Sequence, residues 1–213
     1  MGIFKNKHGA PVLMKMVQAV HNNKDYLGEV DGLIGDGDHG MNMNKGFMLF
    51  GKEYGDKEFD FTEGMSNLGN ILFSQIGGSM GPIYGTIFMD SADAGMEKEN
   101  ISVKDLADML SAGLEGLQEI VEAKVGDKTL VDTLSPAVDA LKAAAAKGHP
   151  YPQALEEMKT AAKQGMESTK NLVAKFGRSS RLGERSRGVL DAGSVSCYII
   201  LEAMADGIAE NLS

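Results

Sequence analysis

The chain has 213 residues, of which 43% are hydrophobic and 24% charged, and its formal net charge is −9 at pH 7. This length and composition allow a sizeable core in one large or two small domains. The acidic charge argues against a general nucleic-acid binder, which we would expect to be basic.

Targeting signals and cysteine content indicate the cellular compartment in which we expect the protein. No apolar run approaches the roughly 20 residues of a membrane span, and residues 1–7 lack an apolar signal region. A single cysteine, Cys197, cannot form an internal disulfide, which suits a reducing compartment. We therefore expect a cytoplasmic protein that neither enters a membrane nor binds nucleic acid directly.

Apolar residues recur with helical spacing along nearly the whole chain. Residues 195–201 are apolar enough for a strand, but residues 203–205 continue the helical spacing. Ser102, with Asp105 three residues later, has the pattern of a helix N-cap. The predicted helices span about 10–27, 41–54, 61–76, 80–96, 102–123, 130–147, 152–175 and 193–211. The sequence thus predicts an all-α fold without a sheet, as a single domain over residues 1–213.

Four of the connections between these helices are rich in glycine, arginine or small polar residues. They comprise residues 35–40, 77–82, 126–129 and 177–193, and they precede the second, fourth, sixth and eighth predicted helices. In an up-and-down arrangement the even-numbered helices all begin at one end. Each helix N-terminus carries roughly half a positive charge. Four of them together would suit an anionic phosphate ligand.

An acidic cluster lies in the first of these connections. Asp31, Asp36 and Asp38 fall within eight residues, among glycines that let the backbone turn tightly. Two carboxylates about 4 Å apart repel by roughly 4 kcal/mol at an effective dielectric constant of about 20. Three together favour a bound cation, and all-oxygen ligands suit Mg²⁺, Ca²⁺ or Mn²⁺ rather than zinc. We expect one or two Mg²⁺ ions here, bridging to a nucleotide; the alternative is a solvated acidic turn.

Two familiar nucleotide motifs do not fit. Residues 35–40 match the glycine spacing of the dinucleotide fingerprint, but no strand precedes them. Residues 46–52 resemble a P-loop, yet Glu53 replaces the required hydroxyl residue and the stretch lies inside a predicted helix.

Several residues at the helix starts are candidates for phosphate binding. His39 contacts a phosphate or a metal-bound water, or else caps its helix, and the same choice applies to Asn42. Ser79 combines a hydroxyl with free backbone N–H groups, which suits a β-phosphate as well as an N-cap. Thr129 is a predicted cap, and Leu130 packs on an adenine face or fills the core.

Four arginines lie in residues 177–188 of this acidic chain. Arginine suits phosphate because its planar guanidinium presents a fork of donors. One or two of them, Arg178 first, would clamp the nucleotide, and the others face a partner or solvent. Asp191, Ala192 and Gly193 open the last helix and would complete the pocket.

These motifs resemble the L-subunit family of dihydroxyacetone kinases. The resemblance covers essentially the whole chain and rests on residues 31–43, 77–85, 126–129 and 177–186. It implies an eight-helix antiparallel up-and-down barrel with a nucleotide at one end, and two Mg²⁺ ions held by Asp31, Asp36 and Asp38. The implied nucleotide site comprises His39, Gly40, Met41, Asn42, Ser79, Met80, Thr129, Leu130, Arg178, Asp191, Ala192 and Gly193. The family loop often has a small residue and then serine before Gly-Pro, so a hydroxyl contact expected at position 80 moves to Ser79.

The resemblance also implies an activity and partners. The chain would bind ADP or ATP with Mg²⁺ and pass a phosphoryl group to dihydroxyacetone, which a separate K subunit holds. No side chain of this chain acts as a catalytic acid or base. A phosphohistidine protein of the sugar phosphotransferase system recharges ADP in some members, and others exchange ATP freely. We expect a homodimer.

Two other functions remain open at this point. The chain could belong to an ATP-dependent ketotetrose kinase, or it could be a non-catalytic, nucleotide-bound co-regulator of a transcription factor. A fatty-acid-kinase-type nucleotide domain is a third interpretation, although that domain normally sits in a longer chain.

Overall fold

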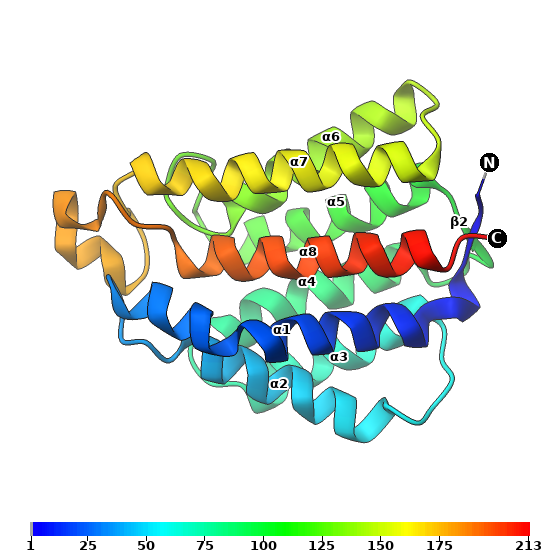
Figure 1. The fold of residues 1–213 in the computed structure, drawn as a ribbon, viewed down its shortest axis with the longest axis horizontal. Coiled ribbons are helices and arrows are strands. Elements are labelled where there is room, and N and C mark those ends of the chain that lie inside the picture. Colours follow the sequence, from blue (N-terminus) through cyan, green and yellow to red (C-terminus); the bar gives the residue numbers. More distant parts are fainter. Residues whose placement is uncertain (1) are drawn as a thin grey trace.

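The computed structural model describes residues 2–213, which form a closed bundle of long helices (Figure 1). Each helix packs against the next along the chain, and the last returns to the first. The α-helices of this part of the chain are α1 (Gly9–Gly32), α2 (His39–Tyr54), α3 (Phe61–Gln75), α4 (Met80–Gly95), α5 (Val103–Ile120), α6 (Val131–Ala146), α7 (Tyr151–Ser168) and α8 (Ala192–Glu210). The predicted all-α, eight-helix fold is confirmed.

The two ends of the bundle differ. The chain termini lie together at one end, where α1 begins and α8 ends (Figure 1). There Phe4 forms an isolated bridge with Leu212. Because the helices alternate in direction, α2, α4, α6 and α8 all begin at the opposite end.

The expectation of no sheet was wrong in one detail. Strand β1 (Phe4–Lys5) pairs antiparallel with β2 (Asn100–Ile101) at the end that carries the termini. Two residues per strand are too few to produce a recognisable alternation of apolar and polar side chains.

Two helix ends were also misplaced, and both matter for the site. Helix α1 runs to Gly32 rather than to residue 27, which puts Asp31 in its last turn. Helix α7 stops at Ser168 rather than at residue 175, and short 3₁₀ turns, η2 (Thr169–Asn171) and η3 (Arg178–Ser186), occupy the connection to α8. The predicted N-cap of α5 is confirmed, because Ser102 Oγ accepts a hydrogen bond from the Asp105 N–H at 3.1 Å.

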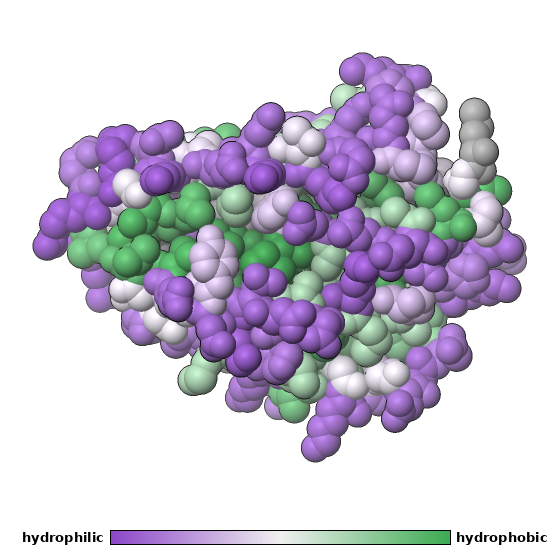
Figure 2. All heavy atoms as spheres, in the orientation of Figure 1, coloured by the Kyte–Doolittle hydropathy of each residue, from purple (hydrophilic) through white to green (hydrophobic). Residues whose placement is uncertain are grey.

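Helix α8 bears on the expectation that no segment spans a membrane. It is long and apolar enough to cross a bilayer by length and composition alone, and 72% of its apolar window is buried. It packs against α1 and α7. Polar side chains cover those two helices, and apolar ones show between them along α8 (Figure 2). Burial in the bundle therefore accounts for its composition.

Gly40 provides a test of the packing between α1 and α2. A Cβ atom there would meet the Lys24 carbonyl oxygen and would lie 2.8 Å from the Gly28 nitrogen, both of them backbone atoms that cannot move aside. We expect Gly40→Ala to lower the free energy of unfolding by about 1–3 kcal/mol in urea titrations of the ligand-free chain. Gly32→Ala is the control, because its nearest contact would be 3.9 Å away. Equal stability of the two variants would contradict this account.

Candidate functional site

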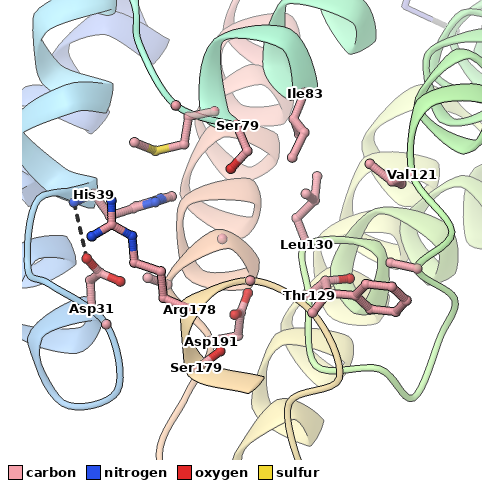
Figure 3. Close-up of a pocket in the computed structure, with 18 of the residues that line it drawn as sticks. Asp31, His39, Ser79, Ile83, Val121, Thr129, Leu130, Arg178, Ser179 and Asp191 are labelled. Atoms are coloured by element: carbon pink, nitrogen blue, oxygen red, sulfur yellow. Dashed lines mark hydrogen bonds between the residues drawn. The ribbon is translucent and has the colours of Figure 1, made fainter. Parts of the chain in front are cut away.

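A cavity of about 790 Å³ opens at the end of the bundle where α2, α4, α6 and α8 begin (Figure 3). All four connections singled out in the sequence contribute to its wall. The prediction that they meet in one place is therefore confirmed. The cavity has two unlike sides, one carrying the acidic cluster and the other an apolar wall.

The acidic side is formed by Asp31, Asp36 and Asp38. One carboxylate oxygen from each lies within 4.8 Å of the others. The connection orients Asp31, whose Oδ2 accepts hydrogen bonds from the Gly37 N–H at 2.8 Å and the His39 N–H at 3.4 Å (Figure 3). Burial and the neighbouring Asp36 charge raise the pKa of Asp38. Three mutually repelling carboxylates with only oxygen ligands fit a hard divalent cation such as Mg²⁺.

Arg178 reaches this cluster from η3. Its guanidinium forms an ion pair with Asp36, although the two residues are far apart in the sequence. The side chain projects across the mouth of the cavity toward Asp31 and His39 (Figure 3). A cation and three carboxylates therefore face the same space.

His39 borders the cavity beneath the cluster, and its side chain is buried. The residue is 8% exposed, and Nε2 lies 2.8 Å from Ser196 Oγ on α8. Ser196 Oγ lies 2.6 Å from the Tyr84 hydroxyl, which donates to the Gly193 carbonyl. Burial lowers the pKa of His39 to about 4, so the imidazole is neutral near pH 7. The ring thus joins α2 to α4 and α8, and its backbone N–H faces Asp31.

The start of α6 is built from buried polar groups. Asp132 accepts hydrogen bonds from the Gly126 and Thr129 N–H groups at 2.6 and 2.8 Å. Thr129 Oγ1 accepts from the Val131 N–H at 3.2 Å, but the N-cap position of α6 is Leu130, one residue later than predicted. Lys128 is 1% exposed, and burial lowers its pKa.

Asp191 caps α8 through Oδ2, which accepts from the Ser194 N–H at 2.8 Å. Burial raises the pKa of Asp191 to about 6.

The apolar wall lies opposite the carboxylates, around Ile83, Val121 and Leu130 (Figure 3), and Phe176 also lines the cavity. Only Leu130 was anticipated. Ile83 and Val121 have the spacing of ordinary core residues, and Phe176 is an isolated apolar residue in a connection, so nothing in the sequence shows that they border a cavity.

Most predicted site residues reach the cavity. The lining includes the three aspartates together with His39, Asn42, Ser79, Met80, Thr129, Leu130, Arg178, Asp191, Ala192 and Gly193. The Ser79 hydroxyl points into it (Figure 3). Gly40 and Met41 do not line it, which corrects two predicted positions. Gly40 packs against the α1 backbone, and Met41 is 74% exposed because it lies on the outer face of α2.

The family follows from comparison with known proteins. A family model described as the DAK2 domain matches residues 33–206, and the chain belongs to this family. It is similar to the ADP-binding subunit DhaL of PEP-dependent dihydroxyacetone kinase 1 from Listeria innocua, at 36% identity over 88% of this chain and 89% of the relative. The corresponding Escherichia coli subunit is 35% identical over 85% of this chain and 87% of its own length.

A solved structure agrees with the fold. The dihydroxyacetone kinase of C. freundii superposes with a TM-score of 0.72 at 22% sequence identity. The match covers 92% of this chain and 34% of that one, so this chain corresponds to about a third of the C. freundii protein. At this identity the likeness supports the bundle architecture alone.

The buried imidazole predicts a pH dependence of stability. Between pH 6.5 and about 4 the unfolded chain binds a proton on His39 that the folded chain does not, so stability falls as the pH falls through this range. The full loss is at most about 3 kcal/mol, at 1.36 kcal/mol per pKa unit. We expect His39→Gln to lose stability less steeply than the wild type between pH 7 and pH 4.5 in urea titrations.

Asp191 changes stability in the opposite direction. Its pKa in the folded chain is raised to about 6, so its contribution to the free energy of unfolding is lost as the pH rises through about 6. The informative quantity is therefore the difference between variant and wild type. His149→Gln, in the connection between α6 and α7 at the far end of the bundle, is the control for the loss of an imidazole. Parallel pH profiles for wild type and His39→Gln would contradict the assignment.

Proposed function

We propose that this chain is the nucleotide-binding subunit of a dihydroxyacetone kinase, holding ADP or ATP with Mg²⁺ in the cavity. The observation that carries the proposal is the meeting of three carboxylates and one arginine at the mouth of a cavity bounded by four helix N-termini. The similar proteins from Listeria innocua and Escherichia coli, which are ADP-binding subunits of PEP-dependent dihydroxyacetone kinases, support the choice of ligand.

Asp31, Asp36 and Asp38 would hold the metal, in our proposal two Mg²⁺ ions. Their oxygens are close enough for shared ligation, and Asp31 is already oriented by the backbone of its own connection. Bound Mg²⁺ would offset the charge of the nucleotide phosphates, which the carboxylates alone would repel.

The positive groups of the chain would orient the phosphates. The starts of α2 and α4 border the cavity, and anions bind readily at helix N-termini. Ser79 adds a hydroxyl beside them. Arg178, already next to Asp36, presents a guanidinium fork of the kind that binds phosphate in two places.

The apolar wall would receive the base. Ile83, Val121 and Leu130 lie on the side of the cavity away from the carboxylates, so a nucleotide with its phosphates at the aspartates would place its purine ring against them. The flat faces of a purine ring bind well against apolar side chains.

Phosphoryl transfer depends on position and charge compensation more than on proton transfer by the protein. Accordingly, we assign no catalytic acid or base to this chain. The acceptor hydroxyl of dihydroxyacetone would come from a separate subunit that closes on the mouth of the cavity. The PEP-dependent relatives support recharging of bound ADP by a phosphohistidine protein.

The metal site predicts the effect of Asp36→Asn on ADP binding. Removing one charge about 4 Å from a cation costs roughly 4 kcal/mol at an effective dielectric constant of about 20. The Mg²⁺-dependent affinity for ADP should therefore fall by on the order of 100-fold or more. Isothermal titration calorimetry with and without Mg²⁺ measures this.

Asp56→Asn, an exposed aspartate in the connection after α2, is the matched control and should bind as the wild type does. Retention of wild-type, Mg²⁺-dependent affinity by Asp36→Asn would refute the proposed site.

The identity of the phosphoryl donor determines whether the purified protein should carry bound nucleotide. If ADP is a resident group recharged in place, native mass spectrometry of wild-type protein should show the mass of chain plus ADP and Mg²⁺, and the Asp36→Asn variant should lack it. A wild-type protein isolated without nucleotide, which then binds ATP and releases ADP readily, would instead indicate ATP as the donor.

A further inference from the structure

Lys128 is an unusual lysine in two respects. It is 1% exposed, the one lysine among the largest fully buried side chains of the described residues. It is also the one non-glycine residue described here with a positive φ, 62°. That conformation is unfavourable for a long side chain and persists where the surroundings require it. The strain therefore points to a specific task for this side chain.

The contacts of the ammonium group show what that task is. Nζ donates to the Thr169 carbonyl and to the Val189 carbonyl, both at 2.5 Å. Thr169 directly follows α7, and Val189 lies just before α8. One buried side chain from the start of α6 therefore joins the two ends of the connection between α7 and α8.

We call residues 170–188 of this connection the arginine loop. Its base is also tied by the Gly188 N–H, which donates to the Lys170 carbonyl at 2.8 Å, and by the Asp191 N–H, which donates to Thr169 Oγ1 at 3.1 Å. The loop extends beyond the ends of α1 and α8 (Figure 1, orange). The position of its outer part depends on how firmly this base is closed.

The outer part of the loop contributes to the cavity. Arg178 and Ser179 line it, and Arg178 pairs with Asp36 (Figure 3). Outside its base, the loop is held to the connection before α6 through Lys175. The Lys175 N–H donates to the Asp127 carbonyl at 3.2 Å, and the Lys175 ammonium pairs with the Asp127 carboxylate at 2.5 Å. The Lys175 side chain is 63% exposed and that of Asp127 10%, so solvent screens the ion pair in part, and Lys175→Met leaves the backbone hydrogen bond in place.

The chemistry at the base favours a hydrogen-bonding task for Lys128. A buried ammonium is costly unless its protons are hydrogen-bonded. Here the acceptors are two backbone carbonyls outside α7 and α8, and that of Thr169 also accepts from the Leu172 N–H in η2. An apolar side chain of similar length would fill the same volume without joining them.

We propose that Lys128 is a positioning residue that fastens the base of the arginine loop and so keeps Arg178 and Ser179 over the cavity. The fastening itself is a property of the ligand-free chain. The consequence for ligand binding rests on the proposed function: a loosened loop would release bound nucleotide sooner, because the residues that close the mouth would spend less time there.

The test compares Lys128→Met with Lys175→Met, a matched pair in which the same side chain is removed from the base and from the exposed part of the loop. Hydrogen–deuterium exchange of the ligand-free proteins is read out by mass spectrometry. In Lys128→Met, peptides from residues 170–190 should exchange at least about tenfold faster while peptides from α3 to α5 are unchanged. Lys175→Met should resemble the wild type.

Stopped-flow measurements with a fluorescent ADP and Mg²⁺ give the second readout. For Lys128→Met we expect a dissociation rate raised about tenfold or more with an association rate within about twofold of the wild type. Lys128→Arg, which restores the charge and donors, should recover part of both effects. Wild-type loop exchange and wild-type dissociation in Lys128→Met would overturn the proposal.

Two outcomes separate the possible failures. If the wild type binds no ADP, the proposed function fails, but the exchange comparison still tests the fastening. If Lys128→Met does not fold, the wild-type protein decides: the amides of Gly188 and Asp191 must exchange far more slowly than those of the outer loop. Exchange at the rate of exposed amides would overturn the proposal.

Discussion

The site depends on the repulsion among Asp31, Asp36 and Asp38. Their oxygens lie within 4.8 Å of one another, an arrangement that is unfavourable for a folded chain unless positive charge is nearby. The structure supplies some of that positive charge itself, through Arg178 and through the backbone N–H groups that donate hydrogen bonds to Asp31. The remaining negative charge is what makes the cluster a place for a cation, and through the cation a place for phosphate.

An even number of alternating helices brings these parts together. Since α2, α4, α6 and α8 all begin at the same end, four connections distant in sequence share one cavity. The opposite end carries the termini and a short sheet, and is tied by backbone pairing. The cavity and the backbone pairing that ties the chain termini thus lie at opposite ends of the bundle, so the described residues of one do not contact those of the other.

Residues in connections could be predicted as site residues, whereas residues on helices mostly could not. Glycine, aspartate and arginine between helices have few other reasons to cluster, so Asp36, Ser79 and Arg178 were predicted to border the cavity. Ile83 and Val121 carry the same helical spacing as core residues, and only the packed bundle shows that they border a cavity. Gly40 was assigned to the ligand because a glycine that admits the α1 backbone resembles, in sequence, one that admits a phosphate.

The end of the bundle that carries the cavity is held by buried polar groups rather than by apolar packing alone. His39, Tyr84 and Ser196 connect α2, α4 and α8, and Lys128 and Asp132 fix the start of α6. Such groups are costly to bury, but once paired they allow few alternative arrangements. A site that must bind a highly charged ligand with little reorganisation benefits from this rigidity, because donors that are already oriented need not be ordered when the ligand arrives.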